Sequence, residues 1–201
     1  NGRALAFDGV DQYASVADNG ALDIAEATTD FCISAEIKTG SDITTTQYLF
    51  GKNVTTTTSG RYGLLVSGGV LYFRYNSDLE TGLLTDNITL QTNTKYHICV
   101  RFDIANSKIY LYIDGVLQNA GGTSYTGVYP NIGSQYKFYI ANGQDSVANV
   151  GLVPAECQLH DVRIYHKDIT SNLTELMAGE KLGDEVAWWY CEDGDSGWVH
   201  D

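Results

Sequence analysis

Short segments of alternating apolar and polar residues, separated by turns, run through most of the chain. A period of two residues places every second side chain on the same face of a strand. Residues 31–38 show this clearly, because Phe31, Ile33 and Ile37 share one face while Cys32 and Glu36 share the other. We therefore predict strands in residues 4–16, 31–38, 48–51, 61–76, 95–102, 109–113, 136–141, 159–165 and 185–191.

Composition supports an all-β chain with one short helix. The sequence holds 21 Gly, 14 Tyr and only 2 Pro, and tyrosine favours strands while glycine favours turns. Gly68 and Gly69, between two alternating runs, predict a β-hairpin. The one helical segment is 170–178, capped by Thr170 or Ser171 and ended by Gly179. This pattern predicts a two-sheet antiparallel β-sandwich of the jelly-roll type.

The length of 201 residues suits one domain, which we assign to residues 1–201. Residues 185–201 either close this domain or open a further module. The 25 acidic and 12 basic residues give a net charge of −13, which would repel a nucleic acid. No apolar stretch approaches the roughly 18 residues that a membrane span needs, so we expect neither nucleic-acid binding nor membrane insertion.

Four segments, in this order, resemble the laminin-G-like, concanavalin-A-like jelly-roll superfamily: residues 4–16, 31–38, 95–116 and 159–180. The third is the most telling, since two strands joined by a short turn end in Tyr-Ile-Asp-Gly. The resemblance implies a concanavalin A-like sandwich and a role in binding outside the cell. His97-Ile98-Cys99 is in addition similar to a strand of the pentraxins.

The four cysteines, Cys32, Cys99, Cys157 and Cys191, form no Cys-x-x-Cys pair, which argues against a zinc site. The pentraxin resemblance implies a bridge between Cys32 and Cys99. Cys32 stands two residues earlier than in that family, a shift of about 6.5 Å along a strand. We expect buried, free thiols, with the bridge as the alternative.

The carboxylates do not form the pattern of the β-glucanase relatives. Retaining glycosidases need two carboxyl groups about 5–5.5 Å apart, which those relatives supply as Glu-x-Asp-x-x-Glu on one strand. Glu36 stands alone in its strand, and the cluster at 192–195 suits a solvated turn. Neither a Gly-x-Ser-x-Gly elbow nor a His-x-x-x-His pair occurs, so we predict a protein that is not an enzyme.

Sugar binding uses aromatic faces together with planar hydrogen-bonding groups. Strand alternation points several such side chains outward. If their strands are neighbours, they form one aromatic and basic patch; otherwise, they are ordinary β-forming residues that cover the sheet. The candidates are Tyr72, Arg74, Asn76, His97, Arg101, Tyr110 and Tyr112.

The resemblance also implies calcium. Residues 142–146 are similar to part of the pentraxin calcium loop, in which Asn142, Gln144 and Asp145 would supply oxygen ligands. A polar turn is the alternative, because Gly143 stands where that family has an acid. Asp161 lies next to the position of a structural calcium ligand in the β-glucanases, which is His160 here.

Taken together, these features predict a non-catalytic carbohydrate-binding or adhesion module of an extracellular, cell-surface or phage virion protein. Its expected partner is a glycan or cell-surface polysaccharide, with other protein subunits also considered. Two alternatives remain: a structural or protein-interaction domain, such as a phage tail, fibre or decoration domain, and a glycoside hydrolase with unrecognised catalytic residues.

Overall fold

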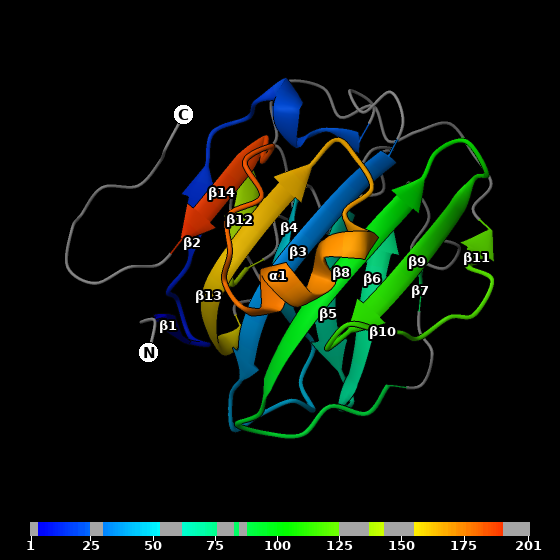
Figure 1. The fold of residues 1–201 in the computed structure, drawn as a ribbon. Helices are drawn as coiled ribbons and strands as arrows, with labels where there is room; N and C mark the ends of the chain where they lie inside the picture. Colours follow the sequence, from blue (N-terminus) through cyan, green and yellow to red (C-terminus); the bar gives the residue numbers. More distant parts are fainter. Residues whose placement is uncertain are drawn as a thin grey trace.

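A computed structural model describes residues 4–24, 30–52, 62–75, 83–84, 88–124, 137–142 and 155–190. Within them, the strands form two antiparallel sheets that pack face to face (Figure 1). We call them sheet A and sheet B. The prediction of an all-β sandwich with one short helix is confirmed.

Sheet A has the order β1-β13-β3-β8-β9-β10, with β14 beside β13 and β11 beside β9. Its strands are β1 (Leu5–Asp8), β3 (Asp30–Thr39), β8 (Lys95–Asp103), β9 (Lys108–Ile113), β10 (Val116–Leu117), β11 (Thr123–Ser124), β13 (Glu156–Tyr165) and β14 (Ala187–Tyr190). Both β1 and β14 pair with β13, β1 along residues 156–159 and β14 along residues 161–164. The segment 187–190 therefore lies in sheet A.

Sheet B has the order β2-β12-β4-β5-β6-β7. Its strands are β2 (Ala14–Val16), β4 (Gln47–Lys52), β5 (Tyr62–Ser67), β6 (Val70–Tyr75), β7 (Leu83–Leu84) and β12 (Phe138–Ile140). The predicted hairpin is confirmed: β5 and β6 pair through Gly68 and Gly69, whose φ angles are +58° and +78°. Positive φ at both central residues fits a tight turn that only glycine adopts without strain.

The main core lies between the two sheets and consists of their inward apolar side chains. Phe31, Ile33 and Ile37 of β3 are all fully buried in it, as the alternation predicts. Aromatic rings link the two layers, since the ring centroids of Phe138 and Trp189 lie 5.0 Å apart and those of Phe31 and Tyr62 5.5 Å apart. This core fixes which side chains each sheet presents on its outer face.

A short helix covers part of the outer face of sheet A. The 3₁₀ turns η1 (Gly20–Leu22) and η3 (Thr170–Asn172) and the helix α1 (Leu173–Met177) complete the described elements. In Figure 1, α1 crosses the front of sheet A over β3 and β8. Neither Thr170 nor Ser171 caps α1; instead, the Asp168 carboxylate accepts a hydrogen bond from the Thr170 backbone at 2.8 Å. Gly179 follows the helix end with φ +78°, as predicted. Among the described residues, no helix is long and apolar enough to cross a membrane.

Three cysteines are buried free thiols: Cys32, Cys99 and Cys157. Cys32 and Cys99 lie under α1 in a second apolar cluster with Tyr165, Leu173 and Leu176, and no bridge joins them. Burial raises the pKa of Cys157 to about 12 and that of Cys32 well above its ordinary value. Cys191 lies outside the described residues.

Because a thiolate is the reactive form of cysteine, we expect these three thiols to resist labelling in the folded protein. In a Cys191→Ser variant, Ellman's reagent should detect no thiol under native conditions and three after addition of guanidinium chloride. Rapid labelling of the native variant, or only one thiol after unfolding, would contradict the burial or the free state described above.

Candidate functional site

The side chains predicted to form one patch lie on two different sheets. Tyr72 and Arg74 belong to β6 in sheet B, whereas Tyr110 and Tyr112 belong to β9 in sheet A. The outer faces of a sandwich point in opposite directions. The condition for a single patch, that these strands are neighbours, is therefore not met, because alternation shows which way a side chain points but not which sheet its strand joins. Asn76 lies outside the described residues.

Two of the sheet A candidates pack against other parts of the chain. Tyr112 packs against the cluster beneath α1, and burial raises the pKa of its phenol. His97 is 6% exposed, and its Nε2 lies 2.8 Å from the Ser34 hydroxyl. Burial lowers the pKa of His97, which favours the neutral imidazole. These contacts give both residues a structural explanation.

Arg101 and Tyr110 lie on the same sheet and are both partly exposed. The Arg101 guanidinium lies 5.4 Å from the centre of the Tyr110 ring, within the range of a cation–π contact. Its amino groups also lie 3.2 Å from an Asp30 oxygen and 3.1 Å from an Asp168 oxygen. The charge of Arg101 is thus already neutralised by carboxylates of this chain.

A different arrangement is found on the outer side of sheet B, which we call the β6 face and define as Tyr48, Leu65, Tyr72 and Arg74. Strand register places Tyr48, Leu65 and Tyr72 side by side across β4, β5 and β6. Arg74 donates a hydrogen bond from Nη1 to the Tyr48 hydroxyl, and its guanidinium lies 5.7 Å from the Tyr48 ring centre. Tyr72 and Arg74 both remain partly exposed.

One hydrogen-bond donor of the Arg74 side chain is unused. Its Nε is buried and has no hydrogen-bond partner among the described residues. A buried donor without a partner costs free energy, so a movement of the Arg74 side chain that brought Nε within reach of a ligand oxygen would be favoured. On the β6 face, Tyr48 and Leu65 are each only 2% exposed, so Tyr72 and Arg74 are the side chains that a ligand could reach. Arg101 of sheet A also has a buried Nε without a hydrogen-bond partner among the described residues, but its guanidinium is already paired with carboxylates. Sequence alternation found Tyr72 and Arg74 but missed Tyr48, which only strand pairing brings beside them.

The predicted calcium loop is described only in part. Asn142 follows β12 and is 2% exposed, directly after Ala141, whose φ is +60°. Gln144 and Asp145 lie outside the described residues. The expectation of calcium at this loop stays a prediction.

The second expected metal ligand, Asp161, has other partners. Its carboxylate accepts hydrogen bonds from Arg163 Nε at 2.9 Å and from Trp188 Nε1 at 2.7 Å. Within the described residues, no group of three or more His, Cys, Asp or Glu side chains is placed to hold a metal ion. Asp161 is thus explained by an ion pair beside β14, and its arrangement gives no support to a calcium ligand.

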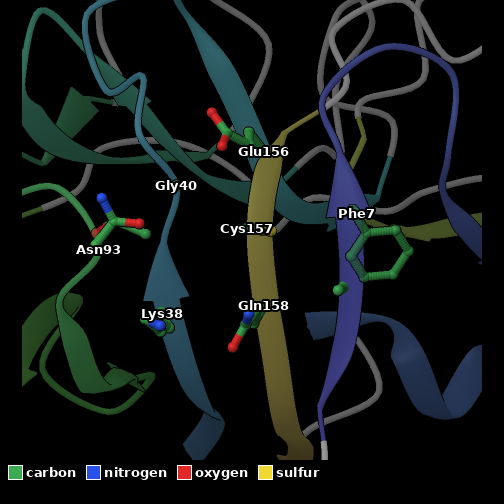
Figure 2. A pocket seen from close by; sticks show the side chains of 9 residues that line it. Phe7, Lys38, Gly40, Asn93, Glu156, Cys157 and Gln158 are labelled. Atoms are coloured by element: carbon green, nitrogen blue, oxygen red, sulfur yellow. The ribbon is translucent and has the colours of Figure 1, made fainter.

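A small pocket lies at the end of sheet A where β1, β3 and β13 meet (Figure 2). Its volume is about 100 Å³, well below the roughly 300–1,000 Å³ of ordinary ligand pockets. The Glu156 carboxylate beside it accepts hydrogen bonds from the Ser41 hydroxyl and the Asp42 backbone. The backbone groups of Ser41 and Asp42, followed by the Ser41 hydroxyl, lower the pKa of Glu156. No sequence motif marks this pocket. Its lining residues are Ala6, Phe7, Lys38, Thr39, Gly40, Asn93, Glu156, Cys157 and Gln158.

Comparison with known proteins decides the family. The family model described as the concanavalin A-like lectin/glucanases superfamily matches residues 8–172. The chain belongs to this superfamily. No curated protein matches the sequence significantly.

Several solved structures share the fold at low sequence identity. A heptameric pentraxin from Limulus polyphemus is 15% identical, with a TM-score of 0.61 over 84% of this chain and 78% of that one. A protein from Bacteroides ovatus, described as a candidate carbohydrate-binding protein, is 15% identical, with a TM-score of 0.71 over 99% of this chain and 54% of that one. A Trypanosoma rangeli sialidase bound to sialic acid is 17% identical, with a TM-score of 0.60 over 87% of this chain.

The fold of this superfamily is compatible with both binding and catalysis. The chain spans only 27% of the length of the sialidase, so that enzyme's activity does not transfer with the fold. A general acid in a glycosidase has a raised pKa. Glu156, the carboxylate at the pocket, has a lowered pKa instead, which does not suit that role.

Proposed function

We propose that the protein is a non-catalytic carbohydrate-binding or adhesion module of an extracellular, cell-surface or virion protein, and that the β6 face contacts the glycan. The observation that carries the proposal is that Tyr72 and Arg74 lie two residues apart on β6 and are both partly exposed, while the buried Nε of Arg74 has no hydrogen-bond partner among the described residues. Membership of the lectin/glucanases superfamily supports the class of ligand.

A guanidinium and an aromatic ring would contact different parts of a sugar. Arg74 is held by its contact with Tyr48, so little conformational entropy is lost when its Nε donates to a hydroxyl. The Tyr72 ring offers an apolar surface to the C–H side of a pyranose. One such face predicts weak binding, with dissociation constants from micromolar to millimolar.

Substitutions on the two sheets test the assignment. Arg74→Ala should weaken glycan affinity at least tenfold, since a hydrogen bond to a charged group contributes about 1.5–3 kcal/mol and tenfold equals about 1.4 kcal/mol. Tyr72→Ala should weaken it by up to about tenfold, since an aromatic contact contributes about 0.5–1.5 kcal/mol. Tyr110→Ala is the matched control, because Tyr110 also lies against an arginine but on the opposite sheet. Isothermal titration calorimetry, with a glycan that the wild-type protein binds, measures the affinity of all three variants. Loss of affinity in Tyr110→Ala, with Tyr72→Ala and Arg74→Ala unchanged, would refute the β6 face.

A further inference from the structure

Lys52 is a lysine buried in the core. It ends β4, and its side chain is 0% exposed. Its register partners on the two flanking strands are Phe138 and Tyr62, both also 0% exposed. Lysine is almost never fully buried unless it is paired, because removing an ammonium from water is costly. The partners of this ammonium are therefore the important question.

Two carboxylates meet the Lys52 ammonium. Asp23 Oδ1 accepts a hydrogen bond from Nζ at 2.5 Å, while Asp18 Oδ1 lies 2.6 Å from the same nitrogen. The two contacts differ in kind, because Asp18 Oδ1 is buried and has no hydrogen-bond partner within the described residues. Asp18 thus touches the nitrogen without the geometry of a hydrogen bond. One ammonium thus contacts two acids, and only one of the two contacts is a hydrogen bond.

We propose that Lys52 and Asp18 form an intramolecular amide cross-link, with Asp23 as the proton-relaying carboxyl group. The neutral Lys52 Nζ attacks Cγ of the protonated Asp18 side chain, and a C–N bond forms. Asp23 accepts a proton from the nitrogen and returns one to the departing hydroxyl, so the C–O bond breaks and one water leaves. Asp23 ends unchanged, and the step needs no oxidant, reductant or co-reactant.

Burial favours this condensation in two ways. In water, a lysine and an aspartate are stabilised as hydrated ions, which opposes amide formation; inside the protein, that hydration is lost. An amide replaces two buried charges with one neutral group. The folded chain also holds the reacting groups in contact, and such positioning is equivalent to a very high effective concentration.

The cross-link would secure an edge of the sandwich. Asp18 lies just after β2, which pairs only with β12 among the described strands of sheet B. Lys52 lies at the end of β4, on the other side of β12. A covalent bond between them would tie the short outer strand to the centre of the sheet. This inference does not depend on the proposed glycan function.

Mass spectrometry of the purified chain tests the cross-link. The intact mass under denaturing conditions should be lower than the sequence mass by one water molecule. Trypsin cleaves after lysine and arginine but not at an amidated lysine, so residues 4–38 and 39–61 should appear as one branched peptide. Dehydration at Asp8-Gly9 would also remove a water, but it would not join two peptides. An intact mass equal to the sequence mass, together with normal cleavage after Lys52, would overturn the proposal.

Variants assign the roles. Lys52→Arg keeps the positive charge but should show the full sequence mass and normal cleavage at position 52. Asp18→Ala should remove the branched peptide, whereas Asp23→Asn should slow or prevent its formation while leaving Asp18 in place. A branched peptide that persists in Asp18→Ala would overturn the assignment of Asp18. If the branched peptide formed as fast and as fully in Asp23→Asn as in the wild-type chain, the proton-relaying role of Asp23 would be overturned.

Discussion

Replacing Arg163 with alanine is expected to destabilise the protein by about 3–5 kcal/mol, the usual cost of breaking a buried ion pair from one side. Arg163 is 1% exposed, and its guanidinium stacks 4.6 Å from the Trp188 ring centre. It also contacts the Asp161 carboxylate at 2.5 Å. Removal of the guanidinium leaves Asp161 with a partly buried and uncompensated charge. Urea unfolding followed by far-ultraviolet circular dichroism measures the change.

Arg101→Ala is the matched control for this prediction. Arg101 lies on the same outer face, stacks on an aromatic ring and pairs with aspartates, but its side chain is 20% exposed. Solvent screening reduces the contribution of such pairs to about 1 kcal/mol or less. If Arg163→Ala and Arg101→Ala lowered the free energy of unfolding equally, burial would not determine the strength of these two ion pairs.

Gly40→Ala is expected to lower the free energy of unfolding by about 3 kcal/mol, at the upper end of the range for overpacking. A Cβ atom at Gly40 would lie 2.4 Å from the backbone oxygen of Glu156 and 2.6 Å from its Cγ. A backbone atom cannot move aside as a flexible side chain can. Either the end of β3 or the start of β13 would have to shift, which would disturb the hydrogen bonds from Ser41 and Asp42 to Glu156.

Gly68→Ala separates this clash from the ordinary cost of losing a glycine. Gly68 has a φ of +58°, and no atom lies within 4 Å of the position of its Cβ. That substitution should cost only the strain of a left-handed backbone, about 1–2 kcal/mol. The same urea titration compares the two variants. If Gly40→Ala lowered the free energy of unfolding less than Gly68→Ala does, that result would contradict the close approach of β3 and β13.

Local features of the fold were predictable from the sequence. The alternation in residues 31–38 identified β3 and its inward side chains because a strand has a fixed period of two. The glycine pair at 68 and 69 identified the β5–β6 hairpin because the turn conformation itself requires glycine. The end of α1 at Gly179 followed from the same physical property. Each of these signals acts over a few neighbouring residues.

Features that depend on distant parts of the chain were not predictable. Residues 4–16 contain two strands, but β1 joins sheet A and β2 joins sheet B. The β6 face needs Tyr48 and Arg74 to meet across three strands, and no local pattern encodes that register. Asp161 likewise meets Trp188 only because β14, more than twenty residues later in the chain, pairs with β13. The candidate site was therefore found only in part from the sequence.

A glycan array probed with the wild-type protein and with Arg74→Ala, once in calcium and once in EDTA, tests the central claim most directly. The wild-type protein should bind a defined set of glycans, and Arg74→Ala should lose most of that signal. Loss of binding in EDTA would add support for a calcium ion at the 142–146 loop. Silence of the wild-type protein in both buffers would contradict glycan binding and favour a structural or protein-interaction domain.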